Sequence, residues 1–169
     1  MQDRVESLVK NYDLTARFID NAAIASLATY LDTGRLRTQV VGVINANAPE
    51  IVREAARQLF EELPDLILPG GNAYTTRRHA MYLRDMDYFL RYSTYALLTG
   101  NNSVLDERLL AGLRDTFNSL GIPFGPTARS IQIMKNMAKE KVVAAGINQA
   151  DFVDEPFDYI IRELSETDV

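Results

Sequence analysis

Hydrophobic residues recur every three or four positions along most of this sequence, which is the spacing expected when one face of an α-helix packs against a core. No stretch shows the alternation of apolar and polar residues that is typical of a half-buried strand. The pattern therefore predicts an all-α fold. The helices that it indicates span residues 5–12, 17–32, 36–44, 47–63, 76–98, 104–120, 123–143 and 157–164.

Glycine, proline and capping residues mark the expected helix ends. Gly34 is expected to terminate the second helix. Asn47 followed by Pro49 is expected to start the fourth, because asparagine caps helices and proline is tolerated in their first turn. The clearest loop covers residues 64–71 and contains a Pro-Gly-Gly sequence. A last loop is expected over residues 146–156, ahead of the terminal helix.

The composition narrows the class of protein. The chain has 169 residues, of which 47% are hydrophobic, and this favours a single globular domain over residues 1–169. The net charge of −5 argues against a nucleic-acid partner, and no apolar run reaches the roughly 18 residues of a membrane-spanning helix. The chain has no cysteine, which excludes disulfides and thiolate metal sites. With an N-terminus that lacks a signal-peptide pattern, this predicts a cytoplasmic protein.

Residues 72–95 carry the densest group of charged and aromatic side chains, with four arginines, two aspartates and five tyrosines. Residues seven positions apart share a helix face, and two such rows are Arg78, Asp85 and Tyr92, and Arg77, Arg84 and Arg91. A carboxylate among methionine and tyrosine side chains requires a cationic or hydrogen-bonding partner. Taken alone, the pattern is also typical of a solvent-exposed helix face on which arginines and aspartates form ion pairs.

The same segment, NAYTTRRHAMYLRDMDYFLRYSTY, resembles the chromophore-binding segment of the phycobiliproteins, and in particular of the allophycocyanin β-type subunits. The stretch LDERLLAGLRDTFNSLGIPFGPT and the motif GPTARSIQIMK match as well, so the resemblance covers the whole chain. Within the allophycocyanin group the motifs look most like the minor β-like core subunit. The resemblance implies a globin-like fold with two extra N-terminal helices that project from the body.

The resemblance also implies a function. The chain would be a light-harvesting subunit of the phycobilisome core, cytoplasmic and peripheral to the thylakoid membrane, that catalyses no reaction. Its cofactor would be a linear tetrapyrrole, phycocyanobilin. Asp85 would be the counter-ion to the inner pyrrole nitrogens, and Arg84, with Arg77 or Arg78, would hold the propionates. The full set of cofactor-binding residues implied in this way is Asn72, Arg77, Arg78, Tyr82, Arg84, Asp85, Tyr88 and Tyr92, the last two flanking the rings.

Tyr82 departs from the family pattern. In phycobiliproteins this position holds the cysteine that bonds the tetrapyrrole, and a phenol cannot form that thioether. The tyrosine ring could lie against a bilin that is held non-covalently, which is the prediction favoured by the retained arginines and Asp85. The ring could instead fill the space of the first bilin ring. The chain would then be a pigment-free structural subunit that completes or caps an allophycocyanin assembly.

Two residues within the motif have alternative interpretations. Asn72 stands where β-type phycobiliproteins carry an asparagine that is methylated on its side-chain nitrogen, and it could equally cap the following helix. His79 is the only histidine, and a globin-like fold invites the hypothesis of a haem ligand. A lone histidine on a helix is more often structural. No metal site is expected.

Assembly is implied by three residues outside the pigment set. In the family, the aspartate equivalent to Asp13 pairs with the partner subunit's equivalents of Arg91 and Tyr95. The resemblance therefore implies a heterodimer with an allophycocyanin α-type subunit, closing into trimeric rings or stacks, with linker polypeptides as further partners. The apolar stripe of the first predicted helix would be covered either by that partner or by the body of the chain itself.

Overall fold

The computed structural model describes residues 4–148 and 151–165, and within them the regular structure is helical, without a strand. The α-helices are α1 (Arg4–Leu14), α2 (Asn21–Glu62), α3 (Thr76–Thr99), α4 (Ser103–Leu105), α5 (Leu113–Leu120), α6 (Phe124–Ala144) and α7 (Asp154–Ser165). Short 3-10 turns cover Pro64–Leu66 and Asp151–Val153, and a π-helical turn covers Asp106–Leu110. The predicted all-α class is confirmed.

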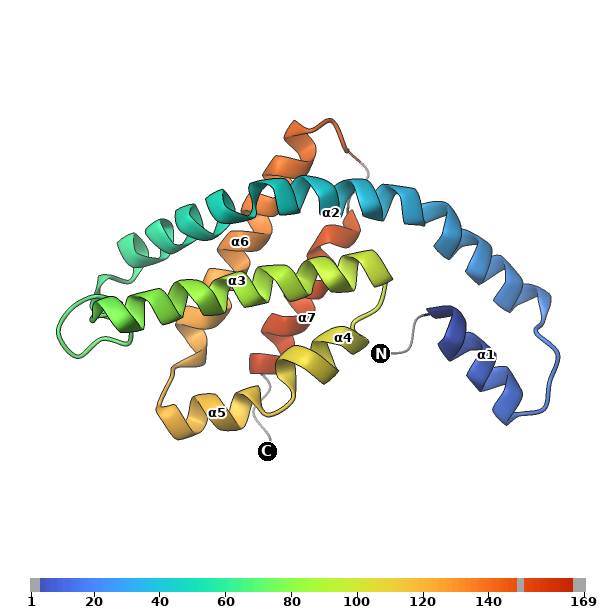
Figure 1. Cartoon of the computed structure of the whole chain (residues 1–169), viewed down its shortest axis with the longest axis horizontal. Helices are drawn as coiled ribbons and strands as arrows, with labels where there is room; N and C mark the ends of the chain where they lie inside the picture. Colours follow the sequence, from blue (N-terminus) through green and yellow to red (C-terminus); the bar gives the residue numbers. More distant parts are fainter. Residues whose placement is uncertain (1–3, 149–150, 166–169) are drawn as a thin grey trace.

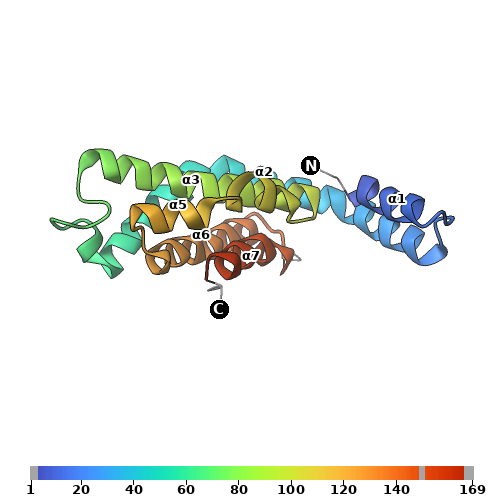
Figure 2. The same cartoon turned by 90° about the horizontal axis from the view of Figure 1, so that it is seen from below.

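The helices form a two-layered body with a projecting arm. Helices α6 and α7 cross beneath α2 and α3, and the most extensive contacts join α2 to α6, α2 to α3 and α6 to α7 (Figures 1 and 2). The arm consists of α1 and the first part of α2, which extend to one side of the body. An N-terminal extension was predicted, but its second helix is continuous with α2 and is not a separate element.

Helix α2 is a single helix of 42 residues where the sequence predicted three. Gly34 and Pro49, the two expected breaks, both lie inside it. A proline inside a helix removes one backbone hydrogen bond and costs roughly 3 kcal/mol. One continuous face of α2 is nevertheless buried on both sides of Pro49, and this packing offsets the cost. The fully buried side chains on that face are Val40, Ile44, Ile51, Ala55 and Leu59.

The predicted helix over residues 104–120 is interrupted. The π-helical turn follows α4, and the amide of Ala111 donates to the carbonyl of Asp106. Gly112 then takes a φ of +73°, which is unfavourable for residues with a Cβ, and α5 begins at the next residue. Gly121 ends α5 as predicted, with a φ of +63°. The terminal helix α7 begins earlier than predicted, because Pro156 is tolerated in its first turn.

The core lies where the two layers meet. The largest side chains buried there come from α2, α3, α6 and α7, and they include Leu59, Met86, Leu90, Met134 and Phe157. Because side chains from both layers interdigitate, the start of α6 is fixed against the N-terminal half of α3. This arrangement positions the two sides of the cavity described below.

A bidentate ion pair joins the end of α2 to the start of α6. Arg129 donates to Glu62 through Nε and Nη2, at 2.7 and 2.8 Å. These hydrogen bonds, with one from Gln58, lower the pKa of Glu62 to about 2. A carboxyl group whose folded pKa is depressed contributes stability above its unfolded pKa and loses it as the pH falls through the folded value.

We therefore expect Arg129→Gln to lower the free energy of unfolding at pH 7. The deficit should shrink between about pH 4.5 and pH 2, where Glu62 becomes protonated in both variants. Urea unfolding followed by circular dichroism across this pH range measures the effect. Arg35→Gln, an exposed substitution on the projecting arm, is the control. A deficit for Arg129→Gln that stays constant down to pH 2 would contradict the assignment to Glu62.

Candidate functional site

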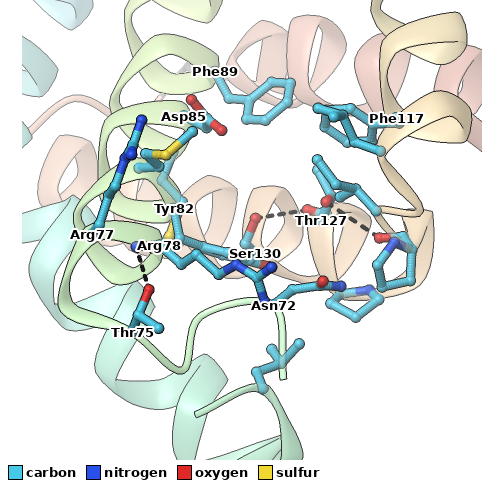
Figure 3. Close-up of a pocket in the computed structure, with 17 residues that line it drawn as sticks. Asn72, Thr75, Arg77, Arg78, Tyr82, Asp85, Phe89, Phe117, Thr127 and Ser130 are labelled. Atoms are coloured by element: carbon cyan, nitrogen blue, oxygen red, sulfur yellow. Dashed lines mark hydrogen bonds between the residues drawn. The ribbon is translucent and has the colours of Figure 1, made fainter. Parts of the chain in front are cut away.

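A cavity of about 380 Å³ opens between the N-terminal half of α3, the loop before it, α5 and the start of α6 (Figure 3). Its polar lining comes mainly from α3 and the preceding loop, and much of its apolar lining comes from α5 and α6. The lining residues are Leu66, Asn72, Thr75, Arg77, Arg78, Met81, Tyr82, Asp85, Met86, Phe89, Phe117, Leu120, Ile122, Pro123, Pro126, Thr127 and Ser130.

The loop between α2 and α3 carries Asn72 to the cavity. It folds back on the 3-10 turn because the amide of Ala73 donates to the carbonyl of Leu66 at 2.8 Å, and Ala73 itself is buried. Helix α3 begins at Thr76 as predicted. Its cap is Thr75, whose Oγ1 accepts from the amide of Arg78 at 3.2 Å. Asn72 therefore lines the cavity without capping the helix.

Asp85 supplies the carboxylate of the cavity. Arg84 donates two hydrogen bonds to Oδ1 of Asp85, from Nε at 3.0 Å and from Nη2 at 2.7 Å. The pair raises the pKa of Arg84, through hydrogen bonding first and charge attraction second. Oδ2 of Asp85 accepts no hydrogen bond from the described residues. Arg84 is not among the lining residues, so it orients the carboxylate from outside the cavity.

Arg77 and Arg78 supply positive charge to the cavity (Figure 3). Both are exposed residues in the first turn of α3. Neither forms an ion pair with a carboxylate in the part of the chain that the structure describes. Their guanidinium groups are therefore available to an anionic ligand at the cavity.

Tyr82 lies in the wall of the cavity. Its ring packs edge-on against Phe60 of α2, with the centroids 5.6 Å apart. Its hydroxyl oxygen is buried and has no hydrogen-bond partner among residues 4–148 and 151–165, although Thr127 is adjacent. Burial raises the pKa of Tyr82 to about 12, and the nearby charge of Asp85 adds to the increase. The ring thus lines the cavity but does not fill it.

His79 does not line the cavity. Its ring packs against the ring of Phe60, with the two ring centroids 5.0 Å apart. The haem hypothesis requires this histidine to face a ligand pocket, and the packing gives it no support. Within the described residues there is also no cluster of three or more histidine, cysteine or acidic side chains that could hold a metal ion.

Tyr88 and Tyr92 do not line the cavity either. The guanidinium carbon of Arg91 lies 4.8 Å from the ring centre of Tyr88 and 5.7 Å from that of Tyr92, and Tyr92 packs edge-on against Tyr95 at 5.5 Å. We call this group the α3 strip; it consists of Tyr88, Arg91, Tyr92 and Tyr95 and forms a neighbouring face of the helix. Asp13 is exposed near the end of α1 and forms no ion pair with Arg91 within the chain.

Sequence reasoning missed the residues that α5 and α6 contribute. Phe117 stacks on Phe124 at 5.6 Å, and this pair fixes the turn that brings Ile122, Thr127 and Ser130 to the cavity. These residues are more than thirty positions away from Asp85, so no spacing rule connects them. The available signal was the GIPFGPT sequence, whose glycines and prolines predicted a turn but not its neighbour in space.

The fold and the cavity define a helical protein whose cavity is lined by one carboxylate and two guanidinium groups. A family model described as "Phycobilisome protein" matches residues 7–164, and the chain belongs to this family. It is 60% identical over the full length of both chains to an allophycocyanin subunit beta-18 of Nostoc sp., and 58% identical, again over both full lengths, to a phycobiliprotein beta chain of Mastigocladus laminosus.

A solved structure is also similar. It is a far-red fluorescent biliprotein derived from a far-red induced allophycocyanin F subunit of the thermophilic cyanobacterium Chroococcidiopsis thermalis. The match has a TM-score of 0.75 and 63% identity, and it covers 79% of this chain and 99% of that one. Together these similarities confirm the predicted globin-like phycobiliprotein fold and the predicted role as a light-harvesting subunit of the allophycocyanin β type.

The sequence predicted that the chain has no membrane-spanning helix. Among the residues that the structure describes, none of the helices combines the length and the hydrophobicity needed to cross a bilayer.

Proposed function

We propose that this chain holds a linear tetrapyrrole of the phycocyanobilin type non-covalently in the cavity around Asp85 and passes its excitation energy onward, without catalysing a reaction. One observation carries the proposal. Tyr82, which replaces the family's cysteine, packs on Phe60 and leaves a cavity of about 380 Å³. The remaining lining combines a carboxylate, guanidinium groups and an apolar wall, and these groups fit the chemistry of a bilin.

Each part of the lining has a distinct task. When bound, the bilin supplies the absorption of visible light. Oδ2 of Asp85 is free to accept from the pyrrole N–H groups, while Arg84 keeps the carboxylate in place. Arg77 and Arg78 complement the two propionates. The apolar side chains from α5 and α6 exclude water and restrict torsion of the rings, so that less excitation energy is lost as heat.

Asn72 contributes its side-chain amide to the same cavity. We propose that this amide is methylated, as the resemblance to β-type subunits implies. A methyl group there would reduce the hydrogen bonding of the amide beside the pigment and would fill space near it. Intact mass measurement of the purified chain, followed by peptide mapping of residues 72–78, detects this modification.

The assembly follows from the exposed surfaces. We propose that the chain folds as one domain and pairs with an allophycocyanin α-type subunit, and that the pairs close into trimeric rings or stacks with linker polypeptides at the thylakoid surface. The α3 strip is accessible in the isolated chain, and Tyr95 is 43% exposed. On the arm, Leu14 and Phe18 are 74% and 99% exposed, which disfavours a free arm in water.

A pigment-free structural subunit is the second candidate. The observation that favours it is the pairing of Asp85 with Arg84, because the carboxylate is already neutralised without a ligand. A cavity of this kind can remain empty without leaving its carboxylate unpaired. The two candidates differ in whether pigment accompanies the purified protein.

The deciding experiment is a visible absorption spectrum of the chain produced with an α-type subunit in cells that make phycocyanobilin. The two chains are then separated in acidic denaturant. We expect a red or far-red band from this chain that is lost on denaturation, because no thioether can form. A chain that is colourless in both conditions but still bound to its partner would identify the structural subunit.

We expect Asp13→Ala to weaken association with the α-type subunit. An exposed ion pair typically contributes about 0.2–1 kcal/mol, that is up to roughly fivefold in affinity. Sedimentation velocity at several protein concentrations measures the change in dissociation constant. Asp32→Ala removes another exposed carboxylate from the same arm and should leave the association unchanged. An unaltered profile for Asp13→Ala would remove this residue from the interface.

A further inference from the structure

Among the described residues that line the cavity, Tyr82 is the one with a buried side-chain polar atom that has no hydrogen-bond partner. This atom is its hydroxyl oxygen. A buried donor without an acceptor loses its hydration and gains nothing in return. Such groups are uncommon in native structures, and a missing ligand is one explanation for them.

Thr127 is close enough to this hydroxyl to lower the pKa of Tyr82 against the effect of burial, but the two groups do not have the geometry of a hydrogen bond. The Oγ1 of Thr127 is directed at the carbonyl of Pro123, at 3.5 Å, and its own carbonyl accepts from Oγ of Ser130 at 2.7 Å. Tyr82 and Thr127 both line the cavity, so the hydroxyl lies directly behind its wall. Burial raises the pKa of Tyr82 to about 12, so the group remains a donor at neutral pH.

The other polar groups of the cavity leave one part of a linear tetrapyrrole unmatched. Arg77 and Arg78 complement its carboxylates, and Asp85 complements its pyrrole N–H groups. The carbonyl oxygens of the two terminal lactam rings are acceptors, to which the proposed function assigns no donor. The Tyr82 hydroxyl is a donor at the cavity wall that has no acceptor among the described residues.

We propose that the Tyr82 hydroxyl donates a hydrogen bond to the carbonyl oxygen of a terminal lactam ring and so fixes that end of the pigment where relatives use a covalent bond. The inference rests on the proposed function, since it requires a bilin in the cavity. It makes Tyr82 a pigment-binding residue that positions one end of the tetrapyrrole. Tyr82 then binds the pigment directly and does more than occupy the position of the family's cysteine.

The test uses the full chain prepared without pigment and then titrated with phycocyanobilin, comparing it with Tyr82→Phe. Loss of one hydrogen bond should weaken pigment binding by about tenfold. The infrared stretching band of the lactam carbonyl should move to higher wavenumber in the variant. In the absence of pigment, Tyr82→Phe should instead be more stable than the unaltered chain. Removing an unsatisfied donor should raise the melting temperature by roughly 2–4 °C.

Tyr159→Phe is the matched control. The hydroxyl of Tyr159 donates to Oδ1 of Asp106 at 2.5 Å, away from the cavity, so this variant should melt earlier and bind pigment normally. Equal affinity and an unchanged carbonyl band for Tyr82→Phe would overturn the inference and leave the proposed function intact. Failure of the unaltered chain to take up pigment would overturn the proposed function and the inference together.

Discussion

Asp85→Asn is expected to abolish pigment binding or to lower its affinity by at least about thirtyfold. The substitution preserves the shape of the side chain but removes the charge that balances a protonated tetrapyrrole. Breaking one partner of a desolvated, hydrogen-bonded charge pair typically costs 2–5 kcal/mol, that is roughly 30-fold to several-thousandfold in affinity. Absorbance titration with phycocyanobilin measures the affinity, and the emission yield of any pigment that remains bound reports how firmly it is held.

Asp87→Asn is the control for that experiment. Asp87 lies on the same helix two residues further on, is exposed and does not line the cavity. Circular dichroism of both variants without pigment establishes that α3 is intact. If Asp85→Asn bound pigment with the affinity and emission of the unaltered chain, Asp85 would have no role as counter-ion, and the proposed orientation of the bilin would have to be abandoned.

Gly71→Ala is expected to destabilise the chain strongly and to disrupt the cavity. A Cβ atom at residue 71 would lie 2.2 Å from the carbonyl oxygen of Asp65 and 2.4 Å from that of Leu66. Both contacts are with backbone, which cannot move aside as a side chain can, so the loop must shift. Overpacking of this kind costs about 3 kcal/mol, and the shift would displace Asn72 from the cavity.

Urea unfolding measures the loss, and Gly70→Ala is the matched control. Gly70 has a φ of +95°, but a Cβ atom added there would meet no other atom within 4 Å, so an alanine adds only backbone strain, roughly 1–2 kcal/mol. Gly71→Ala should therefore be the less stable of the two variants, and it alone should lose pigment binding. The prediction is wrong if Gly70→Ala proves equally or more damaging.

The sequence predicted the helices better than their ends. Helical periodicity is a local property, and the start of α3 at Thr76 and the end of α5 at Gly121 both agree with the local signals. Gly34 and Pro49 were misleading as helix breakers. Their local cost is small compared with the burial of a continuous apolar face, which only the neighbouring helices provide.

The candidate site was predicted in part. Tyr82, Asp85 and Phe89 are spaced by three and four residues and share the face of α3 that lines the cavity. Tyr88 and Tyr92 were placed beside the pigment by resemblance, whereas the structure assigns them to the α3 strip on a neighbouring face. The resemblance to the family indicates which residue types are present. The rotation of α3 relative to α5 and α6 determines which of these side chains line the cavity.

By itself, the sequence determined the all-α class, the family and the absence of a thioether at residue 82, because these depend on residue type and on spacing along one chain. Only the tertiary structure decided that Tyr82 packs on Phe60 and leaves the cavity open, and that α5 and α6 complete its wall. A rotamer and a cavity depend on side chains that are far apart in the sequence. Their positions are set by close packing across helices, which no local pattern encodes.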